Sequence, residues 1–104
     1  HTTLGGHLVG GGTAPAVSNT SANSCGTTAA AIAGSDLAGR ITVGATSGTS
    51  CTVTFGAAFA TAPACIAQNE VTANILKATA STTAVIIAGT MTAADTLVYH
   101  CIGY

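Results

Sequence analysis

Short segments with an apolar residue at every second position recur along this chain, and they constrain its fold more than any other feature. The clearest covers residues 49–55, where Cys51, Val53 and Phe55 share one face and hydroxyl side chains occupy the other. A period of two is the pattern of a β-strand with one buried face. Similar segments, rich in Thr, Val, Ile and Ala, cover residues 40–44, 64–68, 74–78, 84–88 and 96–102.

Turn-forming residues separate these segments, which recur at close to the roughly 8–12 residue spacing of sandwiches and barrels. We therefore expect an all-β fold, a small antiparallel β-sandwich or jelly-roll-like domain. An Ala-rich run at residues 27–33 has the composition of a helix, but it is short and ends at Gly34. A strand and a short turn of helix both stay open there.

Residues 1–24 are rich in glycine and carry little apolar bulk. Such a segment cannot build a core of its own. We expect an extended Gly-rich N-terminal arm or linker, followed by a β domain at residues 25–104. The chain begins at His1 and not at Met, from which we expect a piece of a longer protein or a processed product.

Charged residues are scarce, at 5% of the chain, with Lys+Arg 2, Asp+Glu 3 and a formal net charge of -1. Two basic side chains cannot neutralise the phosphates of a nucleic acid. No apolar run approaches the about 20 residues of a transmembrane helix. We therefore expect neither nucleic-acid binding nor membrane insertion. A net charge near zero promotes association, so the expected partners include other copies of the chain.

The chain contains four cysteines, Cys25, Cys51, Cys65 and Cys101, without the C-x-x-C pair of a zinc ribbon or a thioredoxin-type motif. They allow three disulfide connectivities, or four reduced thiols that pack as small apolar residues. We expect two disulfides, since small extracellular domains use them where the core is small. If residues 49–55 and 64–68 form a hairpin, Cys51 faces Cys65 at a bridgeable distance, which leaves Cys25 with Cys101.

The charged side chains offer no catalytic constellation. Asp36 and Asp95 occupy turns, where such carboxylates bond to nearby backbone. Arg40 is close enough in sequence to pair with Asp36, and Glu70 has no expected role beyond solvation. Neither a Gly-x-Ser-x-Gly elbow nor a phosphate-binding glycine loop is present. We expect a protein that is not an enzyme and that needs no cofactor.

Two further candidate sites involve tyrosine and histidine. Tyr99, His100 and Tyr104 lie close together near the C-terminus and could offer a stacking face for a sugar. His7 could bind a metal ion on the axis of a symmetric trimer, where each copy contributes one ligand. The histidines otherwise lack the spacing of a metal site.

From residue 24 onward the sequence resembles a small β domain found at the C-terminal ends of bacteriophage tail fibres and related virion appendage proteins. The resemblance rests on the ordered cysteines and on the Cys-Thr-Val-Thr-Phe run at residues 51–55. The other segments that carry it are Ser24-Cys25-Gly26, residues 34–44, Phe59, residues 62–65 and residues 99–103, with residues 6–10 and 13–15 upstream.

This resemblance implies a homotrimeric, β-rich fibre tip on the virion surface that attaches to a host receptor, which could be a glycan. It carries over no catalytic residue. Uncharged strand faces would bury against other copies, and residues 83–91 are the stretch we most expect to be covered. Two alternatives stay open. One is a subunit of an extracellular filament in which the N-terminal arm donates a strand to the next copy, and the other is a secreted carbohydrate-binding module or hydrolase.

Overall fold

The structure is a computed structural model, and it describes residues 12–17, 25–26, 31–45 and 49–104. This part of the chain contains β-strands and no helix. The strands are β1 (Ala16–Val17), β2 (Ala31–Gly34), β3 (Ala38–Thr42), β4 (Ser50–Thr54), β5 (Ala64–Asn69), β6 (Lys77–Ala80), β7 (Ala84–Ala88) and β8 (Thr96–Ile102).

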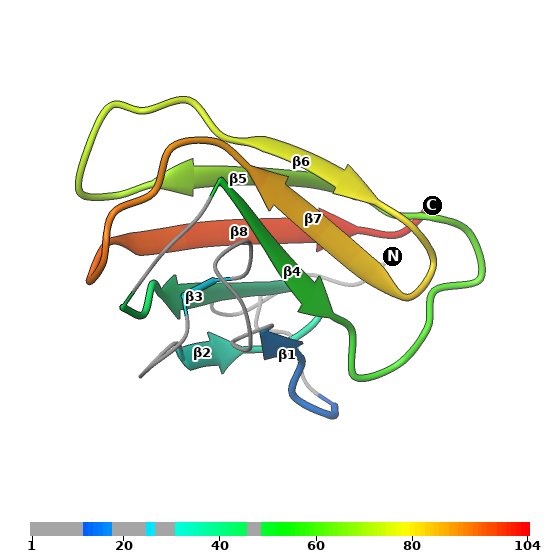
Figure 1. Cartoon of the computed structure of the whole chain (residues 1–104). Helices are drawn as coiled ribbons and strands as arrows, with labels where there is room; N and C mark the ends of the chain where they lie inside the picture. Colours follow the sequence, from blue (N-terminus) through cyan, green and yellow to red (C-terminus); the bar gives the residue numbers. More distant parts are fainter. Residues whose placement is uncertain (1–11, 18–24, 27–30, 46–48) are drawn as a thin grey trace, which may run out of the picture.

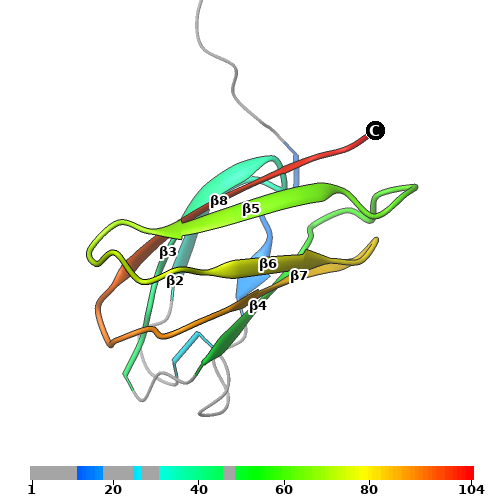
Figure 2. The ribbon, with the colours of Figure 1, turned by 90° about the horizontal axis from the view of Figure 1, so that it is seen from above.

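The strands form two antiparallel sheets. Sheet I has the order β1-β4-β7-β6, and sheet II has the order β2-β3-β8-β5. Figure 1 shows β4, β6 and β7 in front of sheet II, and Figure 2 shows the same two layers from above. The all-β class and the sandwich architecture that the sequence predicts are therefore confirmed.

The core lies between the inner faces of the two sheets, where alternate residues of each strand point. In β4, Cys51 and Val53 are fully buried and stand in register with Ile87 and Val85 of β7. Each fully buried Val, Ile or Leu side chain stabilises the fold by about 1.5–3 kcal/mol. The buried apolar residues are Cys25, Ile41, Val43, Cys51, Val53, Phe55, Val85, Ile87, Met91, Leu97, Tyr99 and Cys101.

Three predicted segments differ clearly from the observed strands, and the first is residues 40–44, where β3 covers Ala38–Thr42. The strand expected at residues 74–78 begins only at Lys77. Residues 70–76 form the connection after β5, and the Asn69 side chain shapes the turn that opens it. Its Oδ1 accepts hydrogen bonds from the backbone N–H groups of Val71 (2.8 Å) and Thr72 (3.2 Å). The Ala-rich run forms β2 over Ala31–Gly34, and residues 27–30 lie outside the described part.

The expected hairpin between residues 49–55 and 64–68 is wrong. β4 pairs with β1 and β7 in sheet I, whereas β5 pairs with β8 in sheet II, so the connection crosses from one sheet to the other. The Asp36 carboxylate holds this connection by accepting hydrogen bonds from the N–H groups of Gly56 (2.8 Å) and Ala57 (3.0 Å). The ring of Phe59 packs edge-on against Phe55 with centroids 4.8 Å apart.

The four cysteines form two disulfides, as predicted, but the favoured pairing was wrong. The bonds join Cys25 to Cys51 and Cys65 to Cys101. Cys51 is not a strand partner of Cys65, because β4 pairs with β7 in sheet I, while Cys65 and Cys101 are register partners on adjacent strands of sheet II. The carbonyl of Cys25 accepts a hydrogen bond from Gly44 N–H (2.8 Å), which ties Cys25 to the segment that follows β3, and the buried Cys25 side chain reaches Cys51 of β4 through the disulfide.

Part of the expected N-terminal arm belongs to the sandwich, because Ala16 and Val17 form β1 and pair with Thr54 and Val53. Residues 1–11 and 18–24 lie outside the described part, so the domain boundary after residue 24 stays a prediction. The segment at residues 83–91 contains β7, whose two edges are covered within the same chain by β4 and β6.

Candidate functional site

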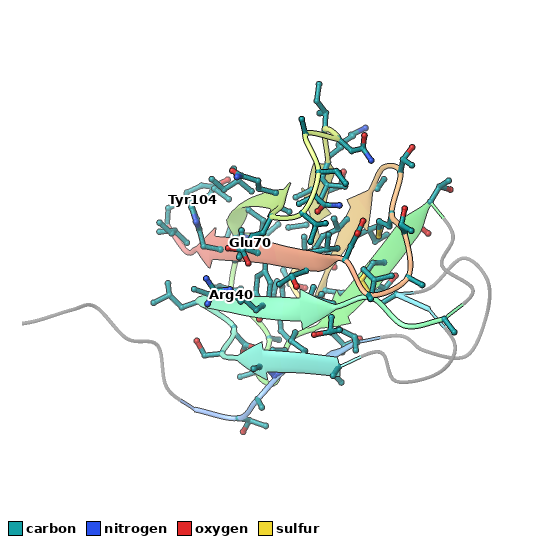
Figure 3. The ribbon with its side chains drawn as sticks, turned by 90° about the vertical axis from the view of Figure 1, so that its left-hand side faces the viewer. Arg40, Glu70 and Tyr104 are labelled. Carbon is teal, nitrogen blue, oxygen red and sulfur yellow. A yellow bond between two sulfur atoms is a disulfide. The ribbon has the colours of Figure 1, made fainter. Side chains whose placement is uncertain are left out.

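An ion pair between Arg40 and Glu70 spans the outer face of sheet II (Figure 3). Arg40 Nε donates to Glu70 Oε1 at 2.8 Å, and the second guanidinium nitrogen donates to Oε2 at 3.2 Å. Hydrogen bonding to Arg40 lowers the pKa of Glu70, and the same bond raises the pKa of Arg40. The expected pairing of Arg40 with Asp36 is therefore wrong, and Glu70 has a partner that its sequence context did not indicate.

The two aspartates were both predicted to bond to backbone within their own turns, and this holds for Asp95, which binds Thr92, whereas Asp36 binds the distant backbone of Gly56 and Ala57. Asp36 holds the connection that follows β4, as described above. Asp95 is buried, and its Oδ2 accepts from Asn69 Nδ2 (2.9 Å) and from the backbone N–H of Thr92 (3.0 Å). Both carboxylates therefore fix loops of the sandwich.

The structure separates the three residues of the expected sugar-stacking face. Tyr99 points into the core because it alternates with His100 along β8, and consecutive strand residues face opposite sides of a sheet. The Tyr99 hydroxyl donates to the carbonyl of Ser35 at 2.6 Å. Its ring lies so close to Gly39 that a Cβ there would stand 2.7 Å from Tyr99 Oη. Tyr99 therefore cannot stack on a ligand, and its inclusion in that site was wrong.

Burial raises the pKa of Tyr99 to about 12, with a smaller contribution from the negative charge of Asp36. The phenol is thus held in its neutral, hydrogen-bond-donating form. His100 lies on the outer face of sheet II, and Tyr104 follows the end of β8 with 88% of its surface exposed (Figure 3).

The outer face of sheet II combines protruding isoleucines with shallow hollows. Ile66 of β5 stands opposite His100 of β8, and Ile102 lies one pair further along the same face. Ile66 is 61% exposed and Ile102 is 55% exposed. A hollow of about 150 Å³ lies beside Ile66 and His100, and one of about 500 Å³ lies beside Arg40. This face is therefore apolar and uneven. The charges of Arg40 and Glu70, which form the ion pair on it, cancel each other.

The outer face of sheet I is flatter and carries mainly hydroxyl and methyl groups. Ile86 of β7 lies at its centre, directly opposite Thr52 of β4 and Thr79 of β6. The charge on this face belongs to Lys77, at the start of the edge strand β6. Both faces of the sandwich are thus poor in charge.

Residues that could hold a metal ion do not gather in the described part of the chain, where no group of three or more His, Cys, Asp or Glu side chains converges. His7, the expected ligand on a trimer axis, lies outside that part. The described residues also contain no helix long and apolar enough to span a membrane.

A feature that the sequence reading missed is the edge of β5, which runs for six residues without a charged side chain. The uncharged run at residues 64–69 is visible in the sequence. Its place at the edge of a sheet depends on pairing with β8, which lies almost 30 residues further along the chain.

Comparison of the chain with protein-family models, with curated proteins and with solved structures finds no match. The resemblance to tail-fibre domains therefore stays a prediction from the sequence.

Proposed function

We propose that this chain is a structural and adhesive domain, the distal part of a phage tail fibre, which assembles with copies of itself at the virion surface and contacts a host receptor. The observation that carries this proposal is how the chain uses its charges. Asp36 and Asp95 bind backbone and amide groups, and Arg40 binds Glu70. Lys77 alone among the charged residues has no such partner in the described part of the chain.

A surface of this kind favours association. Charged side chains of both signs normally cover a soluble domain and keep its copies apart. Here the exposed faces present Thr, Ser, Ala and isolated isoleucines, among them Ile66, Ile86 and Ile102. Burying such side chains between copies removes apolar area from water without leaving a charge unpaired.

The two disulfides fit a protein that works outside the cell, since such bonds persist in oxidising surroundings. They tie the chain at two places, one within sheet II and one between residue 25 and sheet I. A domain at the end of an exposed fibre benefits from both constraints.

Receptor contact is assigned to the end of the sandwich that carries the C-terminus. Tyr104 is the exposed aromatic residue of the described part, and aromatic rings stack on sugar faces. A glycan is therefore the receptor class we favour. Binding of the wild type, of Tyr104→Ala and of Tyr104→Phe to a glycan array checks this assignment, because Tyr104→Phe keeps the aromatic ring that Tyr104→Ala removes.

The assembly itself is tested by size-exclusion chromatography with light scattering at micromolar concentration. We expect a stable assembly, and a trimer is the form that the resemblance predicts. A stable monomer would contradict the proposed function.

The second candidate is a filament subunit in which the N-terminal arm donates a strand. It is favoured by the open edge of β5, to which a further strand can be added. Deleting residues 1–13 separates the two candidates. Loss of head-to-tail polymers supports the filament, whereas an intact closed assembly supports the fibre tip.

A further inference from the structure

The four edge strands of the sandwich differ in how well they resist pairing with another chain. Natural sheet edges are protected by short length, by charge, by proline or by a break in the backbone. β1 has two residues, β2 ends at Gly34 with a φ of 129°, and β6 has four residues and carries Lys77. β5 has six residues and contains neither a charge nor a proline. It is therefore the unprotected edge among the described strands.

The backbone of β5 presents hydrogen-bonding groups to this open edge. Cys101 N–H donates to the carbonyl of Leu37, on the β3 side, so Cys65 and Cys101 do not exchange ladder hydrogen bonds. In an antiparallel ladder, the N–H and C=O groups of such a pair point away from each other's strand. Those of Cys65 and, two residues on, Ala67 therefore face outward.

A second contact fixes the same alternation. Glu70 N–H donates to the carbonyl of Thr96, so the even-numbered positions of β5 bond to β8 and the odd-numbered positions face outward. No turn or loop hydrogen bond of the described residues reaches the backbone of Cys65 or Ala67. Seen from above in Figure 2, β5 runs beside β6 with no described segment lying over it.

We propose that β5 of one copy pairs antiparallel with β5 of a second copy across a two-fold axis, so that their sheets II become one continuous sheet. A second copy fits because the edge is self-complementary. With the two-fold axis at Ile66, Cys65 of one copy lies opposite Ala67 of the other. The outward-facing backbone N–H and C=O groups of these two residues then form reciprocal N–H···O=C bonds. The two Ile66 side chains then face each other, and Ala64 faces Gln68.

No charge opposes this contact. Glu70, the first charged residue after β5, is turned across sheet II to Arg40, away from the open edge. Pairing side chains are thus apolar or neutral throughout, and apolar pairs opposite each other stabilise a sheet.

This inference rests on the proposed assembly of copies, and it adds a symmetry that a closed trimer lacks. A two-fold contact at β5 generates even-numbered species, such as dimers or pairs of trimers. The trimer of the proposed function and the β5 contact can therefore succeed or fail separately.

The test compares two matched variants by light scattering and native mass spectrometry. Ile66→Lys places like charges opposite each other at the axis, and Ile86→Lys makes the same change on the outer face of β7, a central strand. We expect Ile66→Lys to halve the mass of the even-numbered species and Ile86→Lys to leave it unchanged. Equal behaviour of the two variants, or even-numbered species that survive Ile66→Lys, would overturn the proposal.

A second variant covers the case in which Ile66→Lys fails to fold. Ala67→Pro removes an N–H that has no partner among the described residues, and proline is tolerated at such positions of edge strands. We expect a folded domain, judged by circular dichroism, with half the wild-type mass. A wild type that forms only trimers would refute the β5 contact and leave the proposed function standing, whereas a monomeric wild type would refute both.

Discussion

The disulfide pairing offers a sharp quantitative test of the fold, because the structure and the hairpin predicted from sequence make opposite statements about it. The structure joins residues separated by 26 and by 36 positions. In the loop-entropy model each bond destabilises the unfolded chain by about 3.5 kcal/mol. A domain of this length has a total stability of roughly 5–15 kcal/mol, so each bond contributes a large share.

Two double variants separate the pairings. Cys25→Ala with Cys51→Ala removes one observed bond, so we expect a loss of about 3.5 kcal/mol. Cys51→Ala with Cys65→Ala removes one member of each bond and leaves Cys25 and Cys101 without their partners, so we expect a loss of about 7 kcal/mol.

Urea unfolding measures this difference. With a slope near 1.5 kcal/mol per molar urea, the first variant lowers the midpoint by about 2 M and the second by about twice as much. Thiol titration of the unfolded proteins is the control, with no free thiol in the first variant and two in the second. If the second variant lost only one bond and showed no free thiol, Cys25 would be joined to Cys101 and the observed topology would be refuted.

Three further predictions concern buried or paired polar groups. Tyr99→Phe should lower the free energy of unfolding by about 1–2 kcal/mol in urea, since it leaves the Ser35 carbonyl without its donor. Because the folded pKa of Tyr99 is raised to about 12, wild-type stability should fall as pH rises from about 10 to about 12, and Tyr99→Phe should lose less over that range. Asp95→Ala should cost about 1–3 kcal/mol in urea unfolding by orphaning the Asn69 amide, and adding Asn69→Ala should cost more again, because it also frees the N–H groups of Val71 and Thr72. Because Arg40 lowers the pKa of Glu70, the ion pair adds stability that is lost as pH falls below about 4.5. The free energy of unfolding of Glu70→Gln should therefore decrease less over this pH range than that of the wild type, and an equal decrease would contradict the ion pair.

The strands of this fold are predictable from the sequence because their signal is local. Residues 50–54 alternate between fully buried and more accessible positions, and the alternation alone places Cys51 and Val53 on the inner face. The same rule separates Tyr99 from His100, so the error in the expected sugar-binding face came from neglecting a pattern that the sequence already contained.

Pairing between strands is not local, and there the sequence reading failed. Two consecutive strands with compatible alternation can form a hairpin or belong to opposite sheets, and neither choice changes which residues are apolar. The positions of Cys51 and Cys65 were therefore correct along their strands, while the partner of each was not. The partner of Arg40 was missed for the same reason, since Glu70 reaches it only after β5 has docked on β8.

The strand that carries the proposed contact is also the edge strand with the most varied attachments to its own sheet. β5 pairs with β8 at six positions, and the disulfide between Cys65 and Cys101 adds a covalent link. At its end, Asn69 binds Asp95 and the next residue, Glu70, binds Arg40. An edge that merely had to stay unpaired would need only a charge or a proline, and β5 has neither. Its attachments instead suit a strand that transmits force between copies, because a pull on the proposed β5–β5 contact would be spread over a ladder, a disulfide and two polar links.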